Sequence, residues 1–126
     1  MSTHEITLQN VEATITSNEI VLLDFWAAWC GPCRAFGPVF EGASEANPDL
    51  LFGKVDTEAQ QELAAGFQIV SIPTLMVFRD DVLVFAQPGA LSGPQLDQVI
   101  TAVRELDMDE VRARIAEHQE AEEVPQ

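Results

Sequence analysis

Runs of apolar residues alternate along the chain with segments whose apolar positions recur at helical spacing. Residues 20–26 are apolar except for Asp24, and such a run is typical of a strand buried on both faces of a mostly parallel sheet. A short first strand is predicted around Ile6 and Leu8, which alternate with polar residues. Three further strands are predicted from their apolar and β-branched residues: 51–55, 74–78 and 82–85.

Helices are predicted between and after these strands. The first runs from Asn10, whose side chain is expected to cap it, to about Ser17. The other predicted helices have apolar residues three or four positions apart: from the cysteine motif to Asn47-Pro48, from Glu58 to Gly66, and from Ser92 to about Leu106. Pro38 lies inside the second helix and should kink it. Gly66 is expected to end the third.

This order of elements, β-α-β-α-β-α-β-β-α, predicts an α/β fold. Strands that alternate with helices pair in parallel, and the two strands around residues 79–81 add an antiparallel hairpin at the edge. The predicted domain comprises residues 1–106. Gln87-Pro88-Gly89 is expected to break the chain before the last helix.

Residues 107–126 are predicted to form an acidic extension of this domain. Met108, Val111 and Ile115 form one narrow apolar stripe, so a short helix is predicted from Asp109 to about Gln119. Asp107 and Glu110 are placed for a capping arrangement at its start. The end, residues 120–126, is predicted to be disordered because it is charged and nearly free of apolar residues.

Composition and charge narrow the function classes. The 126 residues are 47% hydrophobic and 21% charged, as in a globular domain, and no apolar stretch approaches the roughly 18 residues of a membrane helix. The net charge of −15 argues against binding to nucleic acid or to anionic membranes, and is explained by solubility or by docking to basic partners. Residues 1–10 lack a signal-peptide pattern, so a cytoplasmic location is expected.

The chain has two cysteines, Cys30 and Cys33, three positions apart and directly after the apolar run. Such a pair can form and release a small-loop disulfide, so thiol–disulfide exchange is the first hypothesis. If Cys30 lies at a helix N-terminus, the unpaired N–H groups there favour its thiolate, which is the nucleophile. Pro32 suits a first helical turn, and Gly31 permits close approach of another backbone.

Zinc binding is the alternative for a Cys-x-x-Cys pair. Zinc takes four ligands in a structural site, or three and a water in a catalytic one. The only histidines are His4 and His118, one near each end of the chain. No metal site is therefore expected.

Several separated blocks of this sequence resemble thioredoxin. They are the segment 24–34, Pro38, Lys54-Val55-Asp56, Ile72-Pro73-Thr74 and Gly89-Ala90-Leu91. The resemblance spans about residues 5–106 and implies the thioredoxin fold, with a central mixed five-stranded sheet flanked by helices. It also implies a monomer without a bound cofactor that reduces disulfides of client proteins. A thioredoxin reductase, which uses NADPH, would recharge the Cys30–Cys33 disulfide.

The resemblance also implies roles for single residues. Cys30 would be the nucleophile and Cys33 the resolving cysteine, with Gly31 and Pro32 as modulators between them. Asp24 would relay a proton to and from Cys33, and Lys54 would modulate Asp24. The residues expected to bind the client are Trp29, Ile72, a cis Pro73, Gly89 and Ala90. The alternative for Asp24 is a buried carboxyl satisfied by a local hydrogen bond or by an ion pair with Lys54.

Three positions depart from the family pattern. Asp80-Asp81 occupies a hairpin turn that often contains glycine, which leaves the turn type open. Pro88 cannot donate a backbone hydrogen bond in the client groove, so client preference is expected to shift. Ala28 stands where an acid is often found.

Two alternative functions stay open at this point. The protein could be an oxidase or isomerase with the same fold, or a binding module that uses the acidic extension.

Overall fold

The computed structural model of the protein describes residues 2–123, and their side chains up to residue 119. The strands are β1 (Thr3–Glu5), β2 (Ile20–Trp26), β3 (Leu51–Asp56), β4 (Thr74–Arg79) and β5 (Val82–Pro88). The helices are α1 (Val11–Ser17), α2 (Gly31–Ala46), α3 (Gln61–Gly66), α4 (Gly93–Arg104) and α5 (Met108–Glu123). No helix in this part of the chain is both long and apolar enough to cross a membrane.

The five strands form one mixed sheet in the order β1-β3-β2-β4-β5. β3 pairs in parallel with β1 and β2, whereas β4 pairs antiparallel with β2 and β5. β2 therefore lies at the centre, which explains why its sequence is almost continuously apolar. The predicted α/β class, the mixed five-stranded sheet and the antiparallel hairpin are confirmed.

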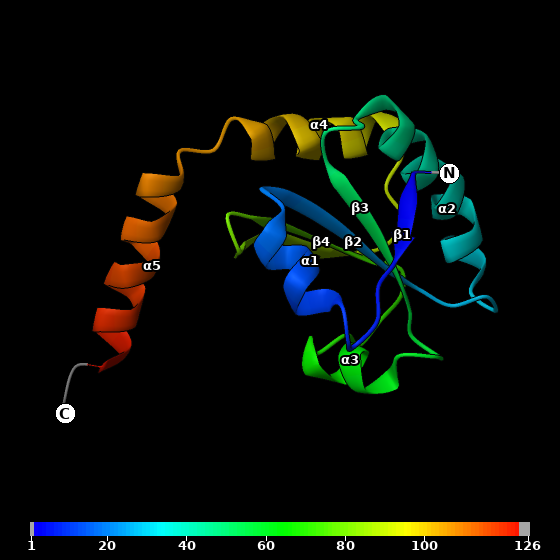
Figure 1. Ribbon diagram of the computed structural model, residues 1–126, viewed down its shortest axis with the longest axis horizontal. Coiled ribbons are helices and arrows are strands. Elements are labelled where there is room, and N and C mark those ends of the chain that lie inside the picture. The colour runs from blue at the N-terminus through cyan, green and yellow to red at the C-terminus, as the bar shows by residue number, and fades with distance from the viewer. Residues whose placement is uncertain (1, 124–126) are drawn as a thin grey trace.

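Helices cover both faces of the sheet (Figure 1). Alternate side chains of β2 point to opposite faces. Ile20 and Leu22 pack in one core cluster with apolar residues of α2 and α4, and Val21, Leu23 and Phe25 pack in a second cluster with residues of α1 and α3. By the same alternation, Asp24 faces the side of α2, and its neighbour in the parallel register is Lys54 of β3.

The first strand and the first cap differ from the sequence prediction. β1 consists of Thr3–Glu5, because its backbone pairs with β3 at the sheet edge and needs no apolar side chains. Ile6 follows the strand and is buried by the core, whereas Leu8 is exposed. Asn10 does not cap α1 with its side chain. Its Oδ1 accepts a hydrogen bond from the Thr7 N–H at 2.8 Å instead.

Two other boundaries also move. α3 begins at Gln61 rather than Glu58, because residues 57–59 form a turn and Gln60 is the N-cap. Gly66 is the last residue of α3, as predicted, and the left-handed conformation that follows is adopted by Gln68, with φ of 57°. β5 extends to Pro88, so the chain changes direction at Gly89, where φ is 101°.

The hairpin between β4 and β5 turns at Asp80-Asp81. Both residues have positive φ, 51° and 67°, as a type I′ turn requires. Aspartate tolerates the left-handed region better than most residues, so the hairpin forms without glycine. The turn type that the sequence left open is therefore one that matches the twist of the two strands.

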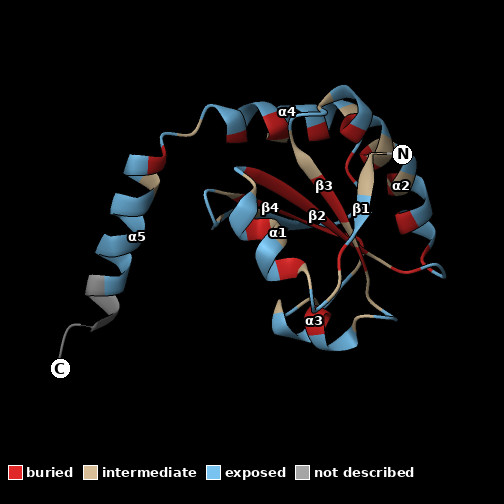
Figure 2. Ribbon diagram, in the orientation of Figure 1, coloured by how far each residue is buried: buried red, intermediate tan, exposed pale blue. Residues whose placement is uncertain are grey.

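α5 projects away from the domain and is mostly exposed (Figures 1 and 2). Asp107 Oδ1 accepts hydrogen bonds from the N–H groups of Asp109 and Glu110, which satisfies the predicted cap on one side. Met108 is buried at the start of the helix. The helix is longer than predicted. Its turns up to residue 123 are helical rather than disordered, and residues 124–126 lie outside the described residues.

Candidate functional site

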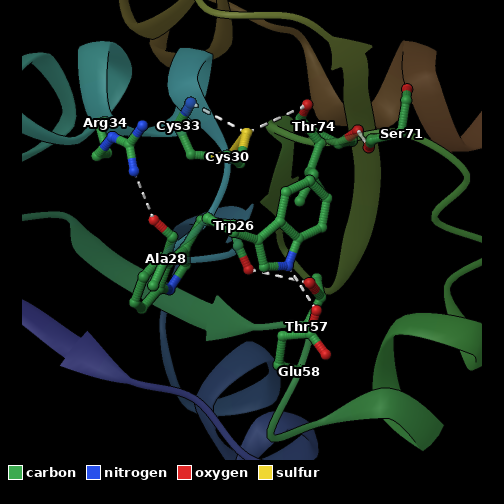
Figure 3. The surroundings of a disulfide bond; sticks show 11 residues. Trp26, Ala28, Cys30, Cys33, Arg34, Thr57, Glu58, Ser71 and Thr74 are labelled. Carbon is green, nitrogen blue, oxygen red and sulfur yellow. Dashed lines mark hydrogen bonds between the residues drawn. A yellow bond between two sulfur atoms is a disulfide. The ribbon is translucent and has the colours of Figure 1, made fainter.

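Cys30 and Cys33 form a disulfide at the junction of β2 and α2. Cys30 is the N-cap of α2, and its sulfur accepts a hydrogen bond from the backbone N–H of Cys33 at 3.2 Å (Figure 3). Pro32 occupies the first turn, where its missing N–H leaves no hydrogen bond unmade. A sulfur at a helix N-terminus that receives an N–H bond is stabilised as thiolate when the disulfide is opened.

The backbone before Pro73 lies against the disulfide. The carbonyl oxygen of Ile72 is 3.7 Å from Cys30 Sγ, and the Ile72–Pro73 bond is cis, as the resemblance implied. Because a disulfide sulfur has no hydrogen, this approach is a packing contact in the oxidised protein. The N–H of Gly89 donates to the Pro73 carbonyl at 2.8 Å, which holds the loop with Gly89 and Ala90 beside this segment.

The loop between β2 and Cys30 is fixed by two hydrogen-bonding side chains. Nη1 of Arg34, one turn into α2, donates to the carbonyl of Ala28 at 3.1 Å (Figure 3). Thr57 donates from both its N–H and its hydroxyl to the Trp26 carbonyl, at 2.9 Å and 3.0 Å. These bonds hold the backbone that leads into Cys30. Gly31 and Pro32 are exposed, whereas Cys30 and Cys33 are buried.

Trp29, next to Cys30, is 66% exposed, and its indole Nε1–H donates to Oε1 of Glu58. Glu58 was not predicted as a site residue, because the sequence pattern placed it in a helix. Asp56 was the available signal, because an aspartate can hydrogen-bond the backbone two residues ahead and form a turn. Its Oδ1 accepts from the Glu58 N–H at 3.0 Å, which places Glu58 in a turn facing Trp29.

Asp24 is buried in the central strand, and its Oδ1 has no hydrogen-bond partner. Burial raises the pKa of Asp24 to about 7, while the positive charge of Lys54 acts in the opposite direction. Among the described residues, Lys54 has no carboxylate within ion-pair distance. Its Nζ lies 4.8 Å from the centre of the Trp26 ring instead. The alternative of a satisfied Asp24–Lys54 ion pair is therefore wrong.

A cavity of about 160 Å³ opens beside the second cysteine. Its lining residues come from the β2–α2 loop, the first turns of α2 and β3: Trp26, Ala27, Ala28, Cys33, Arg34, Gly37 and Lys54. The cavity has polar edges and room for water. Lys54 lines the same cavity as Cys33, and its positive charge acts on Asp24, which is buried beside it in β2 and is not a lining residue of the cavity.

The described residues contain no group of three or more histidines, cysteines, aspartates or glutamates that could hold a metal ion.

Comparisons with known proteins agree on one family. The thioredoxin family model matches residues 2–102. A Streptomyces coelicolor protein provisionally named thioredoxin 2 is 64% identical over 118 residues, which span 94% of this chain and 88% of that protein. A solved mutant thioredoxin from Halobacterium salinarum has a TM-score of 0.78 and 30% identity, covering 84% of this chain and 94% of that one.

One further match contains a second activity. A bifunctional thioredoxin reductase/thioredoxin of Mycobacterium leprae is 48% identical over 66 residues, which span 52% of this chain and 14% of that protein.

Proposed function

Because the chain belongs to the thioredoxin family and is a thiol–disulfide oxidoreductase, we propose that it reduces disulfide bonds of client proteins through Cys30 and Cys33. The observation that carries the proposal is the position of the Cys30 sulfur. It caps α2, accepts the Cys33 N–H and lies beside the Ile72 carbonyl, so a thiolate there is stabilised next to a backbone edge that an extended client can approach.

In the first step, the Cys30 thiolate attacks one sulfur of the client disulfide. The S–S bond of the client breaks, a mixed disulfide forms between Cys30 and the client, and the released client thiolate takes a proton from water. Gly89 and Ala90 bind the client on the side of the cis Pro73, and Trp29 binds it on the other. Small residues at positions 89 and 90 let the client backbone come close.

In the second step, the Cys33 thiol loses its proton and its sulfur attacks Cys30 Sγ. The mixed disulfide breaks, the Cys30–Cys33 disulfide forms, and the client leaves with its second thiolate. In total, two electrons pass from the protein to the client. Asp24 accepts the Cys33 proton, because an acid with a pKa of about 7 exchanges protons readily at neutral pH. Lys54 modulates this acid.

The cycle closes when another dithiol reduces the Cys30–Cys33 disulfide. We propose that a thioredoxin reductase supplies this dithiol and that NADPH supplies its electrons. The relative that joins both activities in one chain supports a reductase as partner. The protein then acts as a monomer in the reducing cytoplasm, where a single cysteine pair is typical of catalysis and where repulsion between copies of charge −15 opposes association.

Reduction of insulin by NADPH and a thioredoxin reductase tests this function. The wild-type chain should turn over insulin disulfides, and Cys30→Ser should be inactive. Cys33→Ser should instead accumulate a mixed disulfide with insulin, detectable by mass spectrometry. Redox titration of the cysteine pair in the same samples separates a reductant from an oxidant. Full activity of Cys30→Ser, or a strongly oxidising potential, would overturn the proposal.

A further inference from the structure

The two most exposed large apolar side chains of the described residues belong to residues close in sequence to Cys30 or to Ile72, which contacts it. Five large apolar side chains are exposed: Leu8, Trp29, Val70, Leu83 and Ile115. Val70 is 96% exposed and Trp29 is 66% exposed, and the other three are less than half exposed. Trp29 adjoins Cys30, and Val70 is two residues from Ile72, whose carbonyl contacts the Cys30 sulfur.

The backbone around Val70 keeps its side chain turned outward. The residue before it, Ile69, is half-buried against the core on the α3 side of the sheet, and Ile72 is packed there as well. The Ile69 N–H donates to the Ala64 carbonyl at 3.0 Å, which ties this segment to α3. Val70 therefore cannot join the core without breaking these contacts, and its apolar surface stays in water.

When a partner covers an apolar side chain that is held in water beside a reactive centre, the free energy of binding becomes more favourable. Residues 71–73 form a bend, and two residues span at most about 7 Å even when extended, so Val70 lies within reach of a client segment that pairs with the Ile72 backbone. In such a segment alternate side chains point the same way. The client residue that covers Val70 is then two positions from the residue opposite Ile72. That residue is the reacting cysteine, because the Ile72 carbonyl lies 3.7 Å from Cys30 Sγ.

We propose that Val70 is a specificity-determining residue that favours clients with an apolar side chain two positions from the reacting cysteine. The inference rests on the proposed function, because it assigns the client preference of that site. It requires only that a client chain lies along residues 70–72 while its disulfide meets Cys30. Single exposed apolar residues are common on protein surfaces, so the test must separate a contact from mere exposure.

The test is a double-mutant cycle on the rate of disulfide exchange. The reduced full-length chain is mixed with peptide disulfides that have leucine or serine two positions before, or two positions after, the reacting cysteine. Val70→Thr keeps the side-chain shape and replaces one methyl group by a hydroxyl. Leu83→Thr is the matched control, because Leu83 is an exposed apolar residue of β5 and not of the site. A small aromatic disulfide, dithiobis(nitrobenzoate), reports the chemistry of the cysteines alone.

At one of the two peptide positions, Val70→Thr should slow exchange with the leucine peptide about fourfold, as expected for the loss of one buried methyl group. Exchange with the serine peptide of the same position should stay unchanged. Leu83→Thr should change neither rate, and both variants should reduce the small disulfide like wild type. Equal effects of Val70→Thr on leucine and serine peptides, or no effect on either, would overturn the inference. If the wild-type chain fails to reduce the small disulfide, the proposed function itself is wrong.

Discussion

Trp29 is held by Glu58: the exposed indole donates its Nε1–H to the Glu58 carboxylate, which a turn after β3 presents. Because the indole is mostly exposed, packing alone does not fix its orientation beside Cys30. A hydrogen bond to a charged acceptor is therefore the main restraint on a residue that we expect to bind clients. This relationship makes Glu58 a positioning residue of the site.

Substituting Glu58 should loosen Trp29 without changing the cysteine chemistry. Glu58→Ala should shift the Trp29 indole N–H resonance in the NMR spectrum and slow insulin reduction roughly fivefold, the effect of losing one hydrogen bond worth about 1 kcal/mol. Glu58→Gln keeps an acceptor oxygen and should restore most of the rate. Glu62→Ala, in the exposed first turn of α3, is the control. An unshifted indole resonance in Glu58→Ala would contradict the positioning role.

The buried acid should make the protein less stable at neutral pH than at acid pH. The folded-state pKa of Asp24, about 7, lies above the unfolded value of 3.8, so the folded state holds an extra proton between these values. The free energy of unfolding therefore falls as the pH rises from about 4 to about 7 and stays lower above that. Asp24→Asn removes the ionisable group, and should stabilise the protein by about 2–4 kcal/mol at pH 8 and by much less at pH 4.

Urea unfolding at both pH values measures this difference. Asp97→Asn, on the exposed surface of α4, is the matched control. The same Asp24→Asn variant should resolve the mixed disulfide more slowly at neutral pH, since Cys33 loses its proton acceptor. Equal stabilisation at pH 4 and pH 8 would show that the gain is not electrostatic.

The C-terminal extension should contribute to stability but not to exchange. Nη1 of Arg79 donates to three carbonyls at the end of α4 and beyond it, and Met108 is buried at the start of α5, so the extension is attached near the sheet. Arg112 pairs with Asp80 in the hairpin turn at 3.7 Å, on an exposed surface where such pairs contribute little. Deleting residues 107–126 should lower the free energy of unfolding by about 1–3 kcal/mol through the loss of Met108 burial.

Insulin reduction by the shortened chain should equal that of the full chain. Met108→Ala in the full chain should reproduce most of the loss of stability, and Ile115→Ala, farther along α5, should reproduce little of it. A slower rate for the shortened chain with its stability restored at lower temperature would instead assign the extension a part in client or reductase binding.

The parts of the fold that depend on burial could be predicted from the sequence, because burial leaves an apolar pattern. β2 was predicted over its full length, and the predicted helix from Ser92 to about Leu106 forms as α4 with its spaced apolar residues facing the core. Elements fixed by backbone pairing leave no such pattern. The polar edge strand Thr3–Glu5 was therefore misplaced, and the side chain of Asn10 was assigned to the wrong N–H group.

The site likewise contains residues that could be predicted from the sequence and residues that could not. The cysteine pair and the acid in the central strand are visible in the sequence, because a carboxyl inside an apolar run is costly and uncommon. Glu58 and Val70 could not be predicted, because their importance comes from the spatial approach of loops far apart in the chain. Glu58 lies 29 positions from Trp29, and the Ile72 carbonyl lies 42 positions from the cysteine that it contacts. Only the folded sheet brings these residues, which are far apart in the chain, into contact.

Gly53 of β3 should tolerate no larger side chain without a loss of stability. A Cβ built at this position meets the Cγ1 of Ile6, and Cδ2 of Leu23 at 3.0 Å, so Ile6 occupies the space that a side chain would need. Gly53→Ala should therefore overpack the core and cost about 1–3 kcal/mol of unfolding free energy. Gly42, in the middle of α2, has open space around its Cβ position, and Gly42→Ala should stabilise the protein by about 0.5–1 kcal/mol.

The opposite signs of the two glycine substitutions separate crowding from backbone entropy, because both replace glycine by alanine. Thermal unfolding of both variants measures them. Ile6→Ala provides a further check, since it creates the space that Gly53→Ala fills. The double variant should be more stable than the sum of the two single losses predicts, as neighbours that share one space are not additive. Additive losses would place the cost of Gly53→Ala in the strand backbone rather than in its contact with Ile6.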